Sequence, residues 1–458
     1  MMSRKKVIVG GGITGLFSAL LLLEKCSGEE IILVEKGKIG GLLRSFHYDG
    51  FGSFDIGTHI PAETGSKPVD EILKPFYSGE DWQCFEEATR DLAGVYFENH
   101  LNQDSISPDI NFVDGKDIKV ILADLFMLVS QGVKPDFSGN LETLLLSKYG
   151  VTLTNKYLRP IFESFYQLGL ERLTPFSINF LPVNRIHYFD LEAYQKISQD
   201  EFLRDIFSFP NQTKVPEAFT SGLKSYYPKK VGISVFIENI RIYLESHGVR
   251  ILEDTSVSLV DRGSSDIELL NIGDEQIDIE QVIWTAGLIP LAGFLGNKVD
   301  FSYMDHPRST IIVNLAFDQK LNSTKNYYQY NLDPSSDFYR VTLYQNFSQE
   351  TVEYYKASIE IITDKVSSKT DQEYITSAIE GLKKMTLIGA SHNLSFSAVE
   401  TLPYGFPRPS IKNKIALDKI RIECQGQYEN LLNLGLNSKE GLFFYRDILK
   451  DVYKRILG

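Results

Sequence analysis

His59 closes the segment FDIGTHI at residues 54–60, an apolar stretch that also contains Phe54 and Ile56. An imidazole can give or take a proton near neutral pH, and Gly57 allows a backbone bend that turns such a side chain toward a cleft. A core histidine bonded to a backbone carbonyl is the structural alternative. The neighbouring motifs are therefore needed to tell whether His59 belongs to a ligand site or to the core.

The clearest motif lies near the amino-terminal end, where KKVIVGGGITGLFSALLLLEK predicts a buried strand, a glycine turn and an apolar helix. Gly10, Gly12 and Gly15 match GxGxxG, and Glu35 ends a second predicted strand 20 residues later. The first glycine makes the tight turn, the second lets the backbone approach a pyrophosphate, and the third lets helix and strand pack closely. The helix N-terminus offers N–H groups to the phosphates, and Glu35 can accept from a ribose hydroxyl. The pattern predicts dinucleotide binding rather than a merely structural turn.

A second glycine motif, GGLLRS at residues 40–45, follows this unit directly. Gly40 and Gly41 permit another close approach of backbone to a cofactor, and Arg44 with Ser45 can reach its phosphates or ring edge. A glycine-rich hairpin turn would explain the two glycines but not their position. The stretch resembles the GGxxRS segment of the flavoprotein superfamily that contains amine oxidases, protoporphyrinogen oxidases, phytoene desaturases and UDP-galactopyranose mutase. The resemblance implies FAD as the cofactor and places His59 beside the flavin ring.

Two later segments resemble further parts of the same superfamily. Residues 226–261 are similar to the loop, helix and strand that return the chain to the FAD domain, where Val257 would present its backbone to the adenine. Residues 279–296 resemble the next strand and its turn, with Thr285 and Ala286 near the cofactor. The resemblance assigns the following residues to the cofactor: Gly10, Gly12, Ile13, Thr14, Gly15, Glu35, Lys36, Gly41, Leu42, Arg44, Val257, Thr285, Ala286, Gly435, Phe444 and Arg446.

A narrower resemblance points to the UDP-galactopyranose mutases. GFGSFDIGTHI is similar to their glycine-histidine loop beside the flavin, residues 326–348 to their tyrosine-to-arginine stretch, and residues 402–420 to their tyrosine-proline-threonine segment. The resemblance implies that reduced flavin N5 interconverts the pyranose and furanose forms of a nucleotide-linked sugar. In that reaction Arg340 and Arg185 match the two diphosphate-binding arginines, and Tyr330 matches a tyrosine near the diphosphate. Surface salt bridges and ordinary aromatic packing are the alternatives for these three side chains.

Two departures keep a second function class open. Leu436 stands where the mutases carry an arginine beside the flavin, and residues 88–110 lack the aromatic-proline-aromatic-glutamine stretch that holds uridine. The alternative is an FAD-dependent oxidoreductase of the amine oxidase, protoporphyrinogen oxidase or desaturase type, in which hydride passes from the substrate to the flavin. We favour the mutase class because the segments around Arg340 and residues 402–420 resemble it.

We predict an α/β fold class with a Rossmann-like FAD-binding domain of the GG-motif flavoprotein type. Helical periodicity and strand-like alternation add an inserted helical domain and a substrate domain with a mixed or antiparallel sheet. The FAD-binding domain is expected to be discontinuous, over residues 1–65, 216–295 and 400–458. The inserted, largely helical cap is expected over 66–215, and the substrate-binding sheet over 296–399.

Composition limits the partners of these 458 residues. With 43% hydrophobic and 23% charged residues and a formal charge of −13, nonspecific binding to nucleic acid or to an anionic bilayer is disfavoured. The longest apolar stretches, LFSALLLL and VILADLFMLV, are shorter than a spanning helix needs. We expect a small-molecule substrate, most simply a nucleotide sugar, and leave the oligomeric state open.

Cysteine and histidine usage adds two further expectations. Three scattered cysteines without a CxxC pair, together with a start that enters a strand without a signal peptide, indicate a cytoplasmic protein. The seven histidines form no HxxxH or HxH pair, so no metal site is predicted.

Overall fold

The computed structural model describes residues 4–215, 220–262, 265–350, 353–364 and 368–458. Its first sheet has seven strands, with the parallel strands β1 and β2 at its centre. β12 and β9 extend it in parallel on either side, β18 pairs with β12, and β10 and β11 join through antiparallel pairing. The strands are β1 (Lys5–Val9), β2 (Ile31–Val34), β9 (Arg250–Leu252), β10 (Val257–Arg262), β11 (Ile267–Ile272), β12 (Glu275–Trp284) and β18 (Leu431–Asn433).

Helices cover both faces of this sheet, as continuous apolar strands require. On one face, α1 (Ile13–Leu23) lies between α8 (Ser234–Ser246) and α12 (Tyr445–Ile456). The eight central residues of α1 are all buried, since neighbours surround the helix on every side. On the other face, α9 (Leu288–Phe294) and α11 (Ile411–Cys424) share a core with β10 to β12. The strand, turn, helix and second strand predicted from the glycine motif are therefore present.

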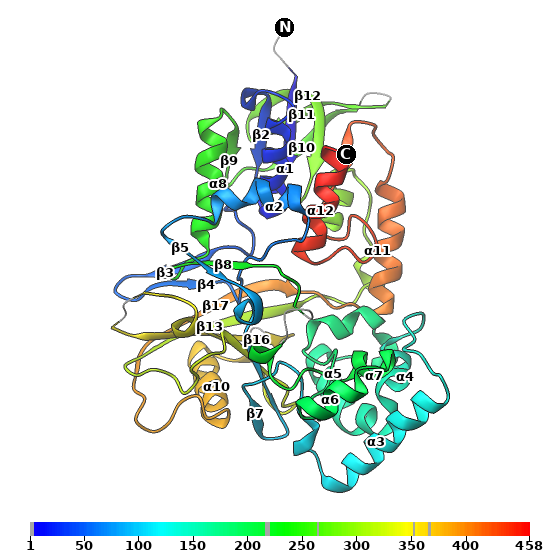
Figure 1. The fold of residues 1–458 in the computed structure, drawn as a ribbon. Coiled ribbons are helices and arrows are strands. Elements are labelled where there is room, and N and C mark those ends of the chain that lie inside the picture. The colour runs from blue at the N-terminus through cyan, green and yellow to red at the C-terminus, as the bar shows by residue number, and fades with distance from the viewer. Residues whose placement is uncertain (1–3, 216–219, 263–264, 351–352, 365–367) are drawn as a thin grey trace.

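The second sheet also has seven strands, in the order β17, β13, β16, β15, β14, β6, β7. All its pairs are antiparallel except that of β14 with β6. Helix α10 (Asp371–Lys384) covers one face through a wholly apolar core (Figure 1). The strands are β6 (Ala93–Phe97), β7 (His100–Asn102), β13 (Arg308–Phe317), β14 (Tyr328–Asn331), β15 (Phe338–Leu343), β16 (Tyr355–Thr363) and β17 (Leu394–Phe406).

A helical lobe lies against the second sheet, on the side away from the first (Figure 1). Its core contains sheet residues such as Val95, Tyr339 and Ile362 as well as helix residues, so the lobe and the sheet form one packed unit. Two antiparallel strand pairs, β3 with β4 and β5 with β8, lie between the sheets. The helices are α3 (Gly115–Ser130), α4 (Leu141–Leu153), α5 (Arg159–Tyr166), α6 (Leu191–Ile197) and α7 (Glu201–Ile206); the pairs are β3 (Ser45–Tyr48), β4 (Gly52–Asp55), β5 (Trp82–Phe85) and β8 (Ser225–Pro228), with α2 (Lys67–Leu73) beside them.

The chain crosses between these units more often than the expected domain boundaries allow. β6 and β7 belong to the second sheet although they lie within 66–215, and residue 400 falls inside β17 of that sheet. The boundary expected at residue 216 lies outside the described residues. Strand pairing requires partners from distant parts of the sequence, so local composition did not reveal these crossings.

Candidate functional site

A cavity of about 500 Å³ lies between the two sheets, at the point where α1 begins. One wall consists of the glycine turns of the first unit, and the opposite wall consists of charged and aromatic side chains from the second sheet and its approaches. Its lining residues are Gly12, Ile13, Thr14, Gly40, Gly41, Leu42, Leu43, Thr58, His59, Ile60, Pro61, Ala62, Arg90, Asp91, Ser225, Tyr328, Arg340, Tyr445 and Arg446.

The turn between β1 and α1 has no room for side chains. Gly10 has φ +112°, and a Cβ added there would lie 2.6 Å from Thr285 Oγ1. A Cβ at Gly15 would lie 1.9 Å from the Gly10 carbonyl oxygen. The Thr285 hydroxyl donates to that same oxygen at 3.0 Å, and Ala286 places its backbone nitrogen 2.9 Å from the position of a Gly10 Cβ. Thr285 and Ala286 therefore fix the turn from the neighbouring strand.

Gly12 and Gly41 leave the cavity wall open. A Cβ at Gly12 would meet nothing within 4 Å, and one at Gly41, where φ is +58°, would meet only the Gly12 Cα at 3.5 Å. Gly12 is also the N-cap residue of α1, and no side chain caps the helix there. The first N–H groups of α1 thus face the cavity without a side-chain acceptor, as an anion-binding helix start requires.

Glu35 braces both turns of this wall. Its Oε2 accepts from the backbone N–H of Gly11 at 2.7 Å and its Oε1 from that of Gly37 at 2.9 Å. Each carboxylate oxygen keeps a second lone pair, so the contact to a ribose hydroxyl remains a prediction. Lys36 is exposed, and Val257 begins β10 with a half-buried side chain. Neither is among the residues that line the cavity.

Of the carboxyl-terminal residues expected at the cofactor, Gly435 and Arg446 lie at this wall, whereas Phe444 does not. Gly435 lies against Thr14, with a Cβ position 3.2 Å from Thr14 Cγ2. Arg446 lines the cavity, and its Nε is buried without a hydrogen-bond partner in the described chain. Phe444 instead packs against Phe176 and other rings of the helical lobe, outside the residues that line the cavity.

Arg44 and Leu436 are not among the residues that line the cavity. Arg44 donates from its Nε to the Gly41 carbonyl at 2.9 Å and so fixes that turn. Leu436 stands where the mutase resemblance would place an arginine, and it is 40% exposed. The neighbouring Arg446 is therefore the arginine that the C-terminal segment brings to this wall.

Arg340 dominates the opposite wall. Its Nε and Nη2 form a two-point ion pair with the Glu360 carboxylate at 2.8 and 3.0 Å. Its Nη1 lies 3.4 Å from the Tyr330 hydroxyl, and the rings of Tyr328, Tyr330 and Tyr339 surround the guanidinium at 5.4 to 5.8 Å. Strand register explains the arrangement, because Arg340 lies directly opposite Tyr330 on β14 and Glu360 on β16.

The loop that carries His59 is fixed between the two lobes. Asp55 accepts hydrogen bonds from Ser45 Oγ at 2.7 Å, the Ile233 N–H at 2.9 Å and the Tyr227 hydroxyl at 2.5 Å. Burial raises the pKa of Asp55 to about 6. Gly57, two residues further on, is also constrained, because its φ is +78° and an added Cβ would lie 3.4 Å from the Glu360 carboxylate.

His59 itself is half-buried and lines the cavity, while its position beside a flavin ring stays a prediction. Burial, and after it the positive charge of Arg340, lower the pKa of His59 to about 4. The imidazole also bonds to the Ile56 backbone, so both alternatives for this residue hold at once. At neutral pH His59 is an uncharged group at the cavity and does not contribute to anion binding by charge.

The cavity residues that the sequence did not identify include Arg90, Asp91 and Tyr328. The Tyr328 hydroxyl donates to Asp91 Oδ1 at 2.8 Å, and both Arg90 and Arg340 lie close enough to influence the Asp91 carboxylate electrostatically. Two signals were present in the sequence. Tyr328 shares a strand face with Tyr330, and the charged pair Arg90–Asp91 lies just before the buried strand β6, with Leu92 between them.

Glu360 was also missed, although its position is informative. It is a buried charged residue within the largely apolar strand β16, which also carries Lys356, and Arg340 is the one charged residue of β15. A buried charge needs a buried partner, so two such strands in one sheet predict an ion pair between them. The charges of the Arg340–Glu360 pair cancel, as do those of Arg90 and Asp91, and this end of the cavity is close to neutral overall.

Arg185 is not part of the cavity. It is an exposed residue of the helical lobe, where its charge acts on Lys148 and Tyr149. The structure thus does not bring Arg185 to the cavity wall beside Arg340, and a role for Arg185 at the diphosphate stays a prediction without support from the lining residues. The segment around it packs Val183 and Ile186 into the core of the lobe, which directs Arg185 outward.

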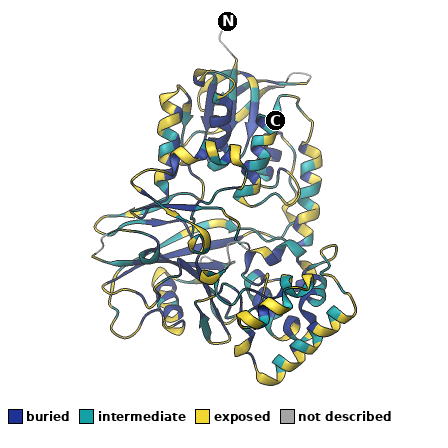
Figure 2. Ribbon diagram, viewed as in Figure 1, coloured by how far each residue is buried: buried dark blue, intermediate teal, exposed yellow. Residues whose placement is uncertain are grey.

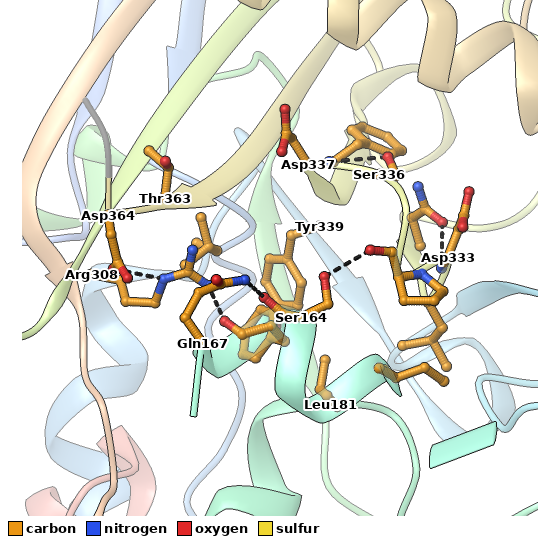
Figure 3. A pocket seen from close by; sticks show the side chains of 17 residues that line it. Ser164, Gln167, Leu181, Arg308, Asp333, Ser336, Asp337, Tyr339, Thr363 and Asp364 are labelled. Carbon is orange, nitrogen blue, oxygen red and sulfur yellow. Dashed lines mark hydrogen bonds and ion pairs between the residues drawn. The ribbon is translucent and has the colours of Figure 1, made fainter. Parts of the chain in front are cut away.

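A second cavity, of about 250 Å³, lies between the helical lobe and the second sheet (Figure 3). Arg308 and Tyr339 line it, and the Tyr339 ring that faces this cavity also flanks Arg340. Arg308 is buried and paired with Asp364 at 3.0 Å. None of the predicted cofactor residues lines this cavity.

The described residues contain neither a membrane-spanning helix nor a metal-binding cluster. No helix within those ranges is long and apolar enough to cross a bilayer. In the same part of the chain, no group of three or more His, Cys, Asp or Glu side chains is arranged to hold a metal ion.

Comparisons with known proteins agree with this geometry. Residues 8–76 match the family model for an NAD(P)-binding Rossmann-like domain. Over 72 residues the chain is 40% identical to an uncharacterized protein in the nifH2 3′ region of Methanothermococcus thermolithotrophicus, a match that covers 16% of this chain and 68% of the relative. The chain belongs to the same family as that relative.

Solved structures match over nearly the whole length. Reduced UDP-galactopyranose mutase superposes with a TM-score of 0.74 at 18% identity, over 99% of this chain and 95% of the mutase. A protein of Exiguobacterium sp. 255-15, provisionally assigned as a protoporphyrinogen oxidase, gives 0.69 at 17% identity over 100% and 98%. Putrescine oxidase with bound putrescine gives 0.55 at 12% identity over 99% and 97%. This chain has the fold of these three proteins. The predicted α/β class with a Rossmann-like domain is confirmed, and the predicted resemblance to UDP-galactopyranose mutase and protoporphyrinogen oxidase is confirmed at the level of the fold.

Proposed function

We propose that the cavity binds FAD. Gly12, Gly41 and the uncapped start of α1 leave a wall of backbone open to a pyrophosphate. Arg446 adds a buried Nε that has no partner in the described chain, and an unsatisfied buried donor of this kind calls for an anionic ligand. The residues present therefore fit the dinucleotide, with the adenosine half along the glycine turns and the ring toward His59.

We further propose that the enzyme is a mutase that interconverts pyranose and furanose forms of a nucleotide-linked sugar. One observation carries this proposal: the cavity that begins at the glycine turns ends at Arg340, with Tyr328 and Tyr330 beside it and Arg90 nearby. Reduced FAD would supply a nucleophilic nitrogen for the anomeric carbon of the sugar. The protein has to bind the diphosphate and keep it close while it is detached.

Each wall residue has a role in that reaction. Arg90 and Arg340 would hold the diphosphate, and the tyrosine rings would keep water from the reacting carbon. Asp91 is the exposed carboxylate at this end, and it would accept a hydrogen bond from a sugar hydroxyl, a group that must lose its proton when a ring closes through it. His59, uncharged at neutral pH, would bind by hydrogen bonding and packing alone.

A specific observation supports the second class, an FAD-dependent oxidoreductase. The Arg340 charge is already offset by Glu360 at 2.8 Å, and Arg185 lies outside the cavity. The end of the cavity around Arg340 is therefore nearly neutral. Such a site can hold an uncharged or amine-bearing substrate as well as a diphosphate. Hydride transfer from such a substrate to FAD needs no bound phosphate, so this class remains the alternative.

One anaerobic experiment separates the two classes. The purified protein is assayed for FAD, reduced with dithionite and mixed with UDP- and dTDP-linked hexoses, and the products are separated by chromatography for ring-size isomers. We expect isomerisation only with reduced FAD. In parallel, oxidised protein is titrated with the same sugars, with polyamines and with porphyrinogens. Bleaching of the flavin by any of these, with no ring isomer formed, would establish the oxidoreductase instead.

Matched arginine variants locate the reaction in the structure. Arg340→Lys retains a charge but loses the two-point geometry, so we expect at least a tenfold loss of turnover. Arg185→Lys is the control, because this residue is exposed and is not among the residues that line the cavity. Equal losses in both variants would contradict the proposed site.

A further inference from the structure

The outward face of α3 carries an apolar and basic surface that the proposed function does not use. The sequence VILADLFMLV at residues 120–129 lies on this helix, yet only Ile121 and Leu125 of α3 are buried. Val120 is 47% exposed, and Phe126 and Met127 are each 57% exposed. Large apolar side chains gathered on one exposed helix face indicate a binding surface.

Helical spacing groups these side chains with two lysines. Positions 116, 119, 120, 123, 126, 127 and 130 share one face at intervals of three and four residues, and they read Lys, Lys, Val, Ala, Phe, Met and Ser. We call these seven residues the α3 face. It contains no acidic residue, with lysines toward the start of the helix and apolar side chains toward its end.

Carboxylates close to the α3 face make other contacts, and that of Asp114 caps the helix by accepting from the Lys116 backbone N–H at 2.8 Å. Asp117 pairs with Lys156 and Tyr157, and Asp124 accepts from the Thr152 N–H at 2.8 Å. Among the described residues, neither lysine of the α3 face has an ion-pair partner. The face therefore combines uncompensated positive charge with exposed apolar area.

We infer that the α3 face binds the surface of an anionic lipid bilayer. A helix with lysines beside Phe, Met and Val can lie in the bilayer interface, with its apolar side chains among the acyl chains and its lysines at the phosphates. Sixteen residues extend over about 24 Å, which suits a helix that lies on a membrane. The helix is at the edge of the molecule farthest from the first sheet (Figures 1 and 2), so it can reach a flat surface without steric obstruction.

Two other features agree with this occupant rather than with a second copy of the chain. A two-fold contact brings the same patch of both subunits together, so the lysines would be desolvated without any acidic partner from this face. The formal charge of −13 belongs to the whole chain, whereas the potential at the α3 face depends on groups within about 8 Å at physiological ionic strength. A bilayer can therefore contact this face while the remaining surface stays in water.

Vesicle sedimentation of the full chain tests the inference. The probes are vesicles of phosphatidylcholine alone and of phosphatidylcholine mixed with phosphatidylglycerol. We expect binding to the mixed vesicles, weakened by salt. The variant Lys116→Glu with Lys119→Glu should reduce the partition coefficient at least about 30-fold, since each lysine charge near an anionic surface contributes about fivefold. The variant Phe126→Ser with Met127→Ser should reduce it roughly tenfold or more.

The matched control removes exposed apolar residues elsewhere. Ile415 and Ile422 on α11 are 66% and 73% exposed, and Ile415→Ser with Ile422→Ser should leave vesicle binding unchanged. Failure of the wild-type chain to sediment with the mixed vesicles would overturn the inference. So would a dimer in light scattering that the Phe126→Ser, Met127→Ser variant dissociates, because a second copy would then cover this face. Neither result affects the FAD assay.

Discussion

At its amino-terminal end the cavity is lined by backbone, whereas its far end is lined by charged and aromatic side chains from strands distant in the sequence. The first wall comes largely from residues 10–15 and 40–43, whose glycines leave space for a ligand. The second depends on Arg340, which meets Tyr330 and Glu360 only through strand register. The backbone wall depends chiefly on its glycines and on the side chains of Thr285 and Glu35 that fix their turns, while the side-chain wall depends on pairing between distant strands.

The largest expected effect would break the side-chain wall. In Glu360→Gln the Arg340 guanidinium loses its buried carboxylate and cannot release its proton, so the free energy of unfolding should fall by about 3–5 kcal/mol. Urea unfolding measures the loss. The surplus charge should also tighten binding of UDP, read by calorimetry at a temperature where the variant is folded. A variant as stable as wild type would show that the ion pair does not hold this wall together.

The loop between the two walls should show opposing pH trends. The pKa of Asp55 is raised to about 6, so the folded state holds a proton that the unfolded chain releases, and stability falls as pH rises from about 4 to 6. The pKa of His59 is lowered to about 4, so stability rises with pH from about 4 to 6.5. In Asp55→Asn only the His59 effect remains, so stability should rise with pH. In His59→Gln only the Asp55 effect remains, so stability should fall with pH. Each effect should change the free energy of unfolding by about 3 kcal/mol across its pH range.

Denaturation midpoints measured from pH 4 to pH 7 test these trends. The two variants should have slopes of opposite sign, with the wild-type slope between them. Parallel slopes in all three proteins would show that neither group titrates differently in the folded and unfolded states.

A pair of glycine variants sharpens the description of the backbone wall. Gly15→Ala forces a Cβ to within 1.9 Å of the Gly10 oxygen and should cost about 1–3 kcal/mol of stability, with loss of FAD. Gly12→Ala meets nothing within 4 Å, so it should keep the thermal midpoint and lose only FAD affinity. Differential scanning fluorimetry measures the thermal midpoint, and the flavin absorbance measures the bound FAD. If Gly12→Ala retains full FAD, then that wall is not where the cofactor approaches.

The smallest expected effect compares two arginines. Arg90→Ala removes a cavity charge and should weaken UDP binding about tenfold, as loss of one charge-assisted hydrogen bond does. Arg185→Ala removes an exposed charge outside the cavity and should leave the dissociation constant within about twofold of wild type. Calorimetric titration with UDP compares them, and the reverse ranking would favour the arginine assignment made from the sequence.

Sequence patterns were reliable where one short segment contains all the necessary information. GxGxxG predicted the strand, the turn and the helix of the first wall, whereas the hydrogen bonds from Glu35 to Gly11 and Gly37 were seen only in the structure. Arg185 is exposed and outside the cavity lining, because a match in one loop does not reveal which way the loop faces. Glu360, Arg90 and Asp91 were missed because their importance depends on neighbours that are far away in the chain.

The sequence by itself determined the Rossmann-like unit, since glycine positions and apolar periodicity act through local backbone geometry. Only the tertiary structure decided that Arg340 is neutralised by Glu360, that Arg185 faces solvent, and that Phe126 and Met127 on α3 are exposed rather than buried. Each of these outcomes depends on pairing and packing between segments separated by tens to hundreds of residues, and such contacts leave no periodic signal in the sequence.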